Sequence, residues 1–263
     1  MVDPKERFTG RVDDYERYRP GYPPELLELA TGACGVGPGR IVADIGSGTG
    51  ILTRLLLTAG ASVIGIEPNA AMRAAAERTL SGEPRFESLD GCAEATGMGD
   101  ASVDVIVAGQ AFHWFDPTRT RAEFARILRP GGWVILAWNR RKDTAFGRDY
   151  EQMLERLAPD YAHVRTRDRT AEAGLRAFFA PGKPTKVVFD NDQRLDQVGL
   201  RGRLLSSSFV PRAADPLFAP IMQRLAEIFR THAQGGRVTL AYDTLVWYGR
   251  LDESLVDPAS ADA

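Results

Sequence analysis

Cysteine, histidine and metal-binding patterns are scarce in this chain of 263 residues. The two cysteines, Cys34 and Cys92, are too few for a framework of several disulfides, and neither lies in a CxxC pattern. The three histidines are His113, His163 and His232, and they stand far apart in the sequence. No cluster of aspartates or histidines suggests a catalytic metal, so we predict that the protein has none.

An excess of either charge is also absent. The 33 basic and 35 acidic residues give a net charge of −2, whereas proteins that neutralise many phosphates usually carry a basic excess. Arginine clusters at 140–142 and 165–169, but such clusters are more often solvated surface. The chain also lacks the Asn/Asp-Pro-Pro-Tyr and Pro-Cys motifs of enzymes that methylate bases in DNA. We therefore expect no nucleic-acid partner.

Long apolar runs are missing as well. No stretch approaches the roughly 18 apolar residues of a membrane span, and the first residues have no apolar core of the kind found in signal peptides. We expect a cytoplasmic protein with no membrane partner. Hydrophobic residues make up 44% of the chain, which is ordinary for a globular protein.

Strand and helix signals alternate from residue 40 onward. Short apolar runs next to glycines predict buried strands, and longer runs with helical spacing predict helices. The expected strands are 41–45, 62–67, 85–89, 103–108 and 133–138, and the expected helices are 24–30, 50–59, 69–80 and 119–128. This alternation predicts an α/β fold with a parallel sheet covered by helices on both faces. Ligands of such sheets bind at the carboxyl ends of the strands.

The pattern changes after residue 139. We expect helices within 143–180, interrupted at Pro159 and Pro181, then a strand at 185–189, helices at 194–207 and 216–232, and a strand at 238–248. We interpret 1–263 as a single domain. Its expected parts are an N-terminal arm and helix (1–35), a cofactor-binding core (36–140), a helical cover with an edge strand (141–210), a last helix and strand (211–250) and a disordered tail (251–263).

The most informative motif is the glycine-rich segment Asp44-Ile45-Gly46-Ser47-Gly48-Thr49-Gly50, between a strand and a helix. Glycines let the backbone turn tightly and let a ligand approach it closely, and the helix start offers N–H donors. A dinucleotide-binding loop would read GxGxxG, whereas this one reads GxGxG and follows an acid. That acid would repel a pyrophosphate but attract a cationic amino group. An ordinary tight turn is the alternative.

This segment resembles the D/ExGxGxG signature of class I S-adenosylmethionine-dependent methyltransferases. The resemblance implies a Rossmann-like fold with a mainly parallel seven-stranded sheet, a helical cover over the pocket and an antiparallel last strand. It also implies that Glu67, followed by Pro68, accepts hydrogen bonds from the ribose hydroxyls; a surface acid is the alternative. After the third strand, Asp90 or Glu94 would hold the adenine, and the pattern favours Ala93 with Glu94; an ordinary turn is again possible.

The segment Gln110-Ala111-Phe112-His113-Trp114-Phe115 follows the fourth expected strand. It is similar to a segment of type 11-like methyltransferases related to trans-aconitate methyltransferase, as are 15–20 and 123–132. The resemblance covers 8–140 well and the rest loosely. It implies that Gln110, Tyr18 and Arg19 contact the cofactor, although Tyr18 and Arg19 could equally belong to an exposed arm. Phe112, His113, Trp138 and Ser207 are the candidate pocket residues.

The aromatic side chains could attract a sulfonium cation or simply pack against the sheet. His113 could act as a general base, since its pKa lies near neutrality, or could line the pocket or be structural. The resulting prediction is a methyltransferase that uses S-adenosylmethionine, releases S-adenosylhomocysteine and methylates a small molecule, as a monomer or homodimer. The alternatives are a non-catalytic S-adenosylmethionine-binding protein and an NAD-dependent oxidoreductase of similar fold.

Overall fold

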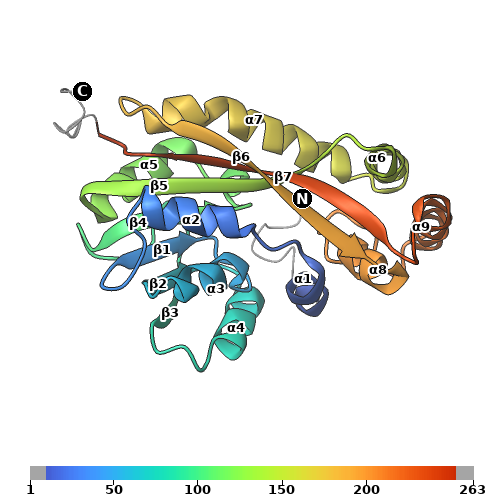
Figure 1. The fold of residues 1–263 in the computed structure, drawn as a ribbon, viewed down its shortest axis with the longest axis horizontal. Helices are drawn as coiled ribbons and strands as arrows, with labels where there is room; N and C mark the ends of the chain where they lie inside the picture. The colour runs from blue at the N-terminus through green and yellow to red at the C-terminus, as the bar shows by residue number, and fades with distance from the viewer. Residues whose placement is uncertain (1–9, 253–263) are drawn as a thin grey trace.

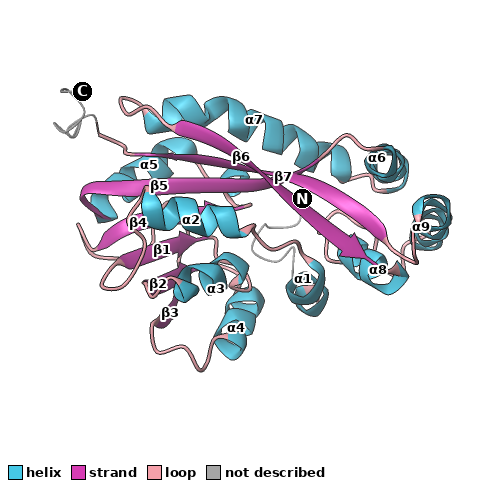
Figure 2. Cartoon of the chain, in the orientation of Figure 1, coloured by secondary structure: helices cyan, strands magenta, loops and turns pink. Residues whose placement is uncertain are grey.

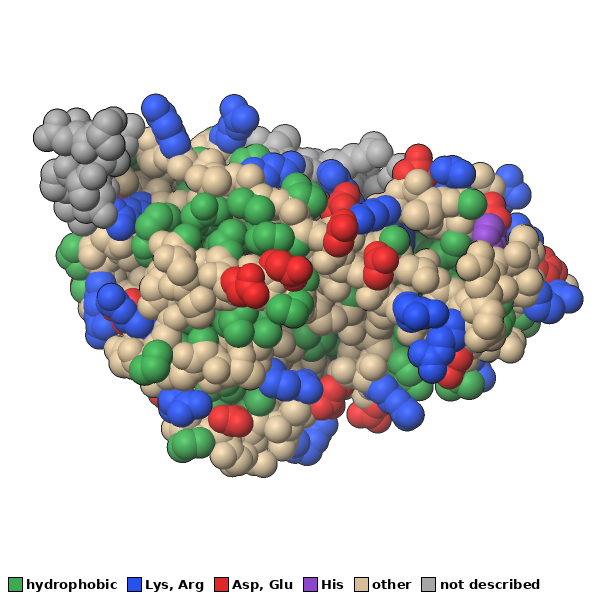
Figure 3. All heavy atoms as spheres, in the orientation of Figure 1, with side chains coloured by type: hydrophobic (Ala, Val, Ile, Leu, Met, Phe, Trp, Pro, Cys, Tyr) green, Lys and Arg blue, Asp and Glu red, His purple; other side chains and the backbone are tan. Residues whose placement is uncertain are grey.

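A computed structural model describes residues 10–252, without the side chains of 165–173. The expected disordered tail and the first part of the N-terminal arm lie mostly outside this range. No helix of the described part is both long enough and apolar enough to cross a membrane. On the face drawn in Figure 3, basic side chains are interspersed with acidic ones, and hydrophobic side chains gather over the region of α2 and the sheet.

A seven-stranded sheet in the order β3-β2-β1-β4-β5-β7-β6 forms the centre of the molecule (Figures 1 and 2). Neighbouring strands among the first five are parallel, and β7 is antiparallel to both β5 and β6. The expected mainly parallel sheet with an antiparallel last strand is confirmed. The strands are β1 Ile41–Ile45, β2 Ser62–Ile66, β3 Phe86–Leu89, β4 Val103–Gly109, β5 Leu128–Arg141, β6 Thr185–Leu195 and β7 Val238–Gly249.

Helices cover both faces of this sheet because successive strand residues point to opposite faces. On one face, β1 residue Val42 shares a hydrophobic cluster with α2 (Pro24–Gly32) and α3 (Ile51–Thr58). On the other face, its neighbour Ala43 shares a cluster with α5 (Pro117–Ile127) and α7 (Tyr161–Phe179). The alternation fixes the register of the sheet, since a slip of one residue would exchange the two faces.

The helical cover is built on the far ends of the long strands β6 and β7, which extend past the parallel sheet in Figure 1. Helices α6 (Ala145–Leu157), α8 (Gln197–Leu205) and α9 (Phe218–His232) bury their apolar sides there against the first half of β7. Tyr150, Leu204 and Tyr242 are central members of this cluster, each 2% exposed or less. Helix α1 (Val12–Tyr18) packs against α8 and α4 (Ala70–Thr79) and so joins the cover to the core.

The main differences from expectation concern β5, β6, α5 and α1. β5 begins at Leu128, not at residue 133, because a register shift between Val103 and Val105 lets the Arg129–Gly132 segment bulge within the pairing with β4. Likewise, β6 continues to Leu195 along β7. Helix α5 begins at Pro117, after Asp116, whose carboxylate accepts hydrogen bonds from the N–H groups of Thr118 and Arg119. Helix α1 was not expected at all.

Candidate active site

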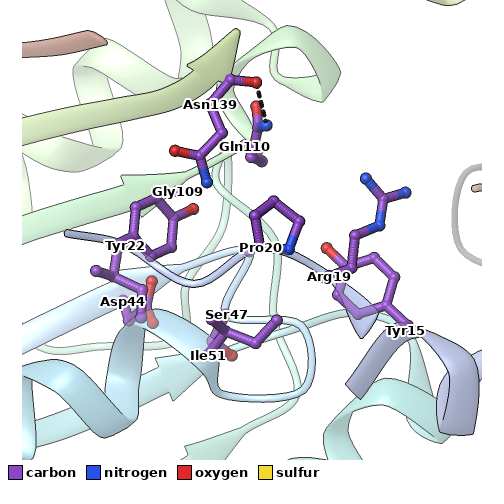
Figure 4. Close-up of a pocket in the computed structure, with 12 residues that line it drawn as sticks. Tyr15, Arg19, Pro20, Tyr22, Asp44, Ser47, Ile51, Gly109, Gln110 and Asn139 are labelled. Carbon is purple, nitrogen blue, oxygen red and sulfur yellow. Dashed lines mark hydrogen bonds between the residues drawn. The ribbon is translucent and has the colours of Figure 1, made fainter. Parts of the chain in front are cut away.

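The carboxyl ends of β1, β4 and β5 meet at one edge of the sheet, at the point where the strand order reverses. Open α/β sheets bind their ligands at this position. A narrow cavity opens there between the glycine loop and the N-terminal arm (Figure 4). Its lining residues are Tyr15, Arg19, Pro20, Tyr22, Asp44, Gly46, Ser47, Ile51, Leu52, Gly109, Gln110 and Asn139.

The three glycines of the glycine loop have left-handed backbone conformations that only glycine adopts without strain. Gly46, Gly48 and Gly50 have φ values of +71°, +58° and +82°. A Cβ on Gly46 would also lie 2.6 Å from the Cβ of Ala111, too close for any real side chain. The loop therefore presents backbone, and not side chain, toward the cavity.

Asp44 carries a carboxylate that is 1% exposed and lines this cavity. Its Oδ2 accepts a hydrogen bond from Thr53 Oγ1 at 2.7 Å, while its Oδ1 is buried and has no hydrogen-bond partner among the described residues. Burial raises the pKa of Asp44 to about 7, and the Glu67 carboxylate adds to the effect. An anionic group in this environment is satisfied best by a cation that can donate a hydrogen bond.

Glu67 lies directly after β2 and is 9% exposed. Its Oε2 accepts the N–H of Gly48 at 2.9 Å, and its Oε1 accepts the N–H of Asn69 at 2.8 Å. Burial raises the pKa of Glu67, although these two backbone bonds oppose the shift. The carboxylate thus ties the glycine loop to the start of α4, and each oxygen keeps a lone pair for a further donor. Pro68 lies within this short connection, between Glu67 and the helix cap Asn69.

Ala93 and Glu94 are placed differently from each other. Ala93 is 2% exposed and belongs to the core between the sheet and α5. Glu94 is half-buried, and its Oε1 accepts the N–H of Asp116 at 2.7 Å. Asp90, the alternative adenine acid, is exposed and pairs with Arg73 at 3.2 Å. Neither Ala93 nor Glu94 lines the narrow cavity, and their part in holding adenine stays a prediction.

The N-terminal arm closes the cavity from the side opposite the glycine loop. Figure 4 shows Asp44 and Arg19 on either side of Pro20. Of the predicted pair Tyr18 and Arg19, only Arg19 lines the cavity; Tyr15, one helical turn earlier, takes the place expected for Tyr18. The guanidinium of Arg19 stacks on the Tyr15 ring at 4.8 Å. The Tyr18 ring packs instead against Gly202 of α8.

Gln110 and Asn139 extend the site from the ends of β4 and β5. Gln110 has a left-handed backbone with φ +55°, rare for a residue with a side chain, and its Nε2 donates to the Asn139 carbonyl at 3.1 Å. Asn139 Nδ2 donates to the carbonyl of Gly21 at 3.0 Å, and its Oδ1 accepts from Thr244 Oγ1 at 2.6 Å. Asn139 thus ties the arm to β5 and β7.

A second and larger cavity, of about 610 Å³, adjoins the first under the helical cover. The two share Tyr15, Arg19, Gln110 and Asn139. The larger one is also lined by the predicted residues His113, Trp138 and Ser207. Phe112 does not line either cavity: it is 2% exposed and packs edge-to-face against Phe178 at 4.8 Å and Trp138 at 6.0 Å. The prediction that Phe112 is a pocket residue is therefore wrong, because the helix α7 covers its ring.

Several lining residues of the larger cavity were not predicted from the sequence. They come from the cover, from the end of β5 and from β7, where no family motif points to them: Arg141, Arg148, Glu151, Tyr161, Arg203, Phe209, Tyr242 and Trp247. One feature of the sequence could have indicated Arg203, since an arginine on the apolar side of a helix is unusual. Arg203 stands in Leu200-Arg201-Gly202-Arg203-Leu204 and is 5% exposed, among the most buried charged residues of the described chain.

Known proteins similar to this chain are methyltransferases by name. Residues 43–136 match the methyltransferase domain family. An uncharacterized methyltransferase from Mycobacterium tuberculosis is 40% identical over 136 residues, which are 52% of this chain and 53% of that protein. An uncharacterized methyltransferase from Geobacillus kaustophilus is 37% identical over 159 residues, 58% of this chain and 68% of the relative. The matched part thus spans about half the length of the mycobacterial relative.

Among solved structures, a candidate type II methyltransferase from Anaeromyxobacter dehalogenans has the same fold. It aligns with a TM-score of 0.65 and 27% identity over 89% of this chain and 98% of the other. The alignment therefore includes the cover as well as the sheet, whereas the family match ends at the fifth strand.

Proposed function

The chain belongs to the class I S-adenosylmethionine-dependent methyltransferases, and we propose that it transfers a methyl group from S-adenosylmethionine to a small molecule held in the larger cavity. The observation that carries this proposal is the buried Asp44 carboxylate beside the glycine loop, with one oxygen that has no partner among the described residues. S-Adenosylmethionine brings an ammonium group that would supply the missing donor.

The charges of the narrow cavity fit the amino-acid end of this cofactor. Asp44 would hold the ammonium, and Arg19, across Pro20, would hold the carboxylate. Charge-assisted hydrogen bonds of this kind contribute roughly 1.5–3 kcal/mol each. An acid in the position of Asp44 would repel the pyrophosphate of a dinucleotide, so Asp44 argues against NAD.

Glu67 and the loop backbone fit the ribose. The Glu67 oxygens already accept two backbone N–H groups, and their second lone pairs could accept the two ribose hydroxyls. The N–H bonds also hold the carboxylate in place before the cofactor arrives, which lowers the entropy cost of binding.

Bound S-adenosylmethionine supplies an electrophilic methyl group on a sulfonium. The residues shared by the two cavities would receive this end, because they lie where the cofactor cavity opens toward the cover. The aromatic ring of Tyr15 would attract the sulfonium cation there. Gln110 and Asn139, which are hydrogen-bonded to each other, form another part of the wall. The surrounding side chains would align the acceptor and exclude water. His113 lines the acceptor side and is the candidate base where the acceptor must lose a proton.

Calorimetric titration of the purified protein with S-adenosylhomocysteine tests the cofactor assignment. We expect binding with a dissociation constant in the micromolar range, about −8 kcal/mol. NADH serves as the control ligand and should give no heat. No binding of S-adenosylhomocysteine to folded, ligand-free protein would refute the proposed function. Binding of NADH in its place would favour an oxidoreductase.

A further inference from the structure

The larger cavity has a charge pattern that the cofactor does not explain. Six basic side chains line it: Arg19, Arg140, Arg141, Lys142, Arg148 and Arg203. Among the described residues, only two acidic side chains, Asp143 and Glu151, line it. Positive charge that is withdrawn from solvent costs free energy unless an anion compensates it.

Four of these six cations are paired with carboxylates. Arg141 pairs with Glu151 at 2.6 Å and Arg148 with Asp143 at 2.8 Å. Arg140 lies 3.9 Å from Asp243, and Lys142 contacts Asp190 and Asp243. These pairs account for both acidic residues of the cavity wall.

Arg19 and Arg203 are different. Within the described chain, neither has a carboxylate within ion-pair distance; their partners are neutral. Arg203 Nε donates to Tyr242 Oη at 3.1 Å, and its Nη1 donates to Ser207 Oγ at 3.1 Å and Ser206 Oγ at 3.4 Å. Arg19 Nη2 donates to the carbonyl of Ser206 at 3.1 Å.

The two guanidiniums also lie close enough to repel each other. Burial lowers the pKa of Arg19 to about 10, and the charge of Arg203 is the second cause. Two like charges this close and largely out of solvent cost free energy, and the described side chains supply no carboxylate within ion-pair distance of either. An anionic ligand for each would remove both the repulsion and the uncompensated burial.

The two arginines divide between the two cavities. Arg19 lines both, whereas Arg203 lines only the larger one. Arg19 is therefore the partner for the cofactor carboxylate, which leaves Arg203 for the acceptor. The need for one further negative charge fits a carboxylate, which a guanidinium binds through two parallel hydrogen bonds.

The uncharged part of the wall indicates the rest of the acceptor. Aromatic side chains dominate it: Tyr15, Trp114, Trp138, Tyr161, Phe209, Tyr242 and Trp247. Trp138 and Trp247 are each 8% exposed, and their indole N–H groups have no acceptor among the described residues. Flat apolar ligands stack on such rings, and the cavity volume suits a molecule of a few hundred daltons.

We propose that the methyl acceptor is a small carboxylic acid with an aromatic body, and that Arg203 binds its carboxylate and so orients it toward the cofactor. This inference rests on the proposed function. Arg203 acts as a specificity-determining residue: it selects the anion and does not hold the cofactor.

Binding of matched acid and amide pairs tests the proposal. The probes are benzoate and benzamide, phenylacetate and phenylacetamide, and indole-3-acetate and indole-3-acetamide, each titrated calorimetrically into protein saturated with S-adenosylhomocysteine. Each pair has one shape and differs in charge. We expect at least one acid to bind about tenfold or more tightly than its amide, as one charge-assisted contact would give.

Substitution of Arg203 locates the effect. We expect Arg203→Gln to abolish the preference for the acid while leaving the S-adenosylhomocysteine dissociation constant within about twofold of wild type. Arg203→Lys, which keeps the charge, should retain part of the preference and serves where the glutamine variant folds poorly. The matched control is Arg201→Gln, which removes an exposed cation of the same helix that lines neither cavity and should leave the preference intact.

Three results would overturn the inference. The first is a panel in which no acid binds more tightly than its amide. The second is a preference for acids that survives in Arg203→Gln. The third is weaker S-adenosylhomocysteine binding in Arg203→Gln, which would assign Arg203 to the cofactor. Failure of the wild-type protein to bind S-adenosylhomocysteine would be a failure of the proposed function, so the two claims are tested separately.

Discussion

Glu67 shows how one side chain can serve the fold and a ligand together. Its two oxygens hold the glycine loop and the start of α4 through the N–H groups of Gly48 and Asn69. An acid expected only to bind ribose therefore also shapes the loop that surrounds the cofactor. For this reason removal of the whole side chain would confound two effects, and a milder change is the better test.

We expect Glu67→Gln to weaken S-adenosylhomocysteine binding at least tenfold, about 1.4 kcal/mol, because an amide has one acceptor oxygen where the carboxylate has two and so can neither accept both ribose hydroxyls nor keep both backbone N–H bonds. Calorimetric titration measures the change. Glu87→Gln, at an exposed position on β3, is the matched control and should bind like wild type. Unchanged affinity in the Glu67 variant would contradict the ribose assignment.

At the scale of elements, α1 is the piece that completes the cavity without belonging to the sheet. Arg11, just before it, donates to the carbonyls of Leu205, Ser207 and Val210, and Gln193 Nε2 donates to the Tyr18 carbonyl at 2.9 Å. Helix α1 is thus held by the cover, and through Tyr15 and Arg19 it forms a wall of the cofactor cavity. Loss of the contact between α1 and α8 should therefore weaken cofactor binding.

Gly202 is the point where that contact can be broken. A Cβ there would lie 2.1 Å from the Tyr18 ring, so Gly202→Ala should displace α1 from α8 and weaken S-adenosylhomocysteine binding several-fold. Gly174→Ala adds the same methyl group to helix α7 where, apart from the backbone of the helix itself, no described atom lies within 4 Å. That control should bind normally and gain up to about 1 kcal/mol of helix stability. Equal binding by the two variants would show that α1 does not depend on this contact.

The core elements and most helices of the cover were predictable, whereas helix α1 and the cavity residues of the arm and cover were not, for a physical reason. β1 and β4 are short apolar runs next to glycines, so their length and flanking residues are enough to place them. Helix α1 has only seven residues, with one buried apolar side chain, Val12, and is stabilised by tertiary contacts that no local pattern records. Which of Tyr15 and Tyr18 lines the cavity depends on which side of that helix meets α8. Whether Arg203 lines a cavity depends on how the cover packs against β7.

For the whole molecule, the buried acid at the centre of the cofactor site should set a pH dependence of stability. The Asp44 pKa is raised to about 7 in the folded protein, whereas in the unfolded chain it lies near 3.9. Between these two values the folded protein keeps a proton that the unfolded chain releases. Stability therefore falls as the pH rises from about 4 to about 7, and is constant with respect to this group above that range.

Replacing Asp44 by asparagine, which cannot ionise, should remove this loss. In urea unfolding of ligand-free protein, the stability of Asp44→Asn relative to wild type should increase between about pH 5 and about pH 8, by on the order of 2 kcal/mol. Taking the difference between the two proteins cancels the titration of every other group they share. A difference that stays flat with pH would mean that Asp44 is already ionised at low pH.

The same titration should control the cofactor. An ionised Asp44 attracts the ligand's ammonium, whereas a protonated one does not, so the wild-type affinity for S-adenosylhomocysteine should rise with pH through about 7 and the affinity of Asp44→Asn should vary less. The cofactor then stabilises most where the ligand-free protein is weakest, since it binds only the folded state. The free-energy cost of burying the charge of Asp44 is thus the reason why Asp44 binds a cation.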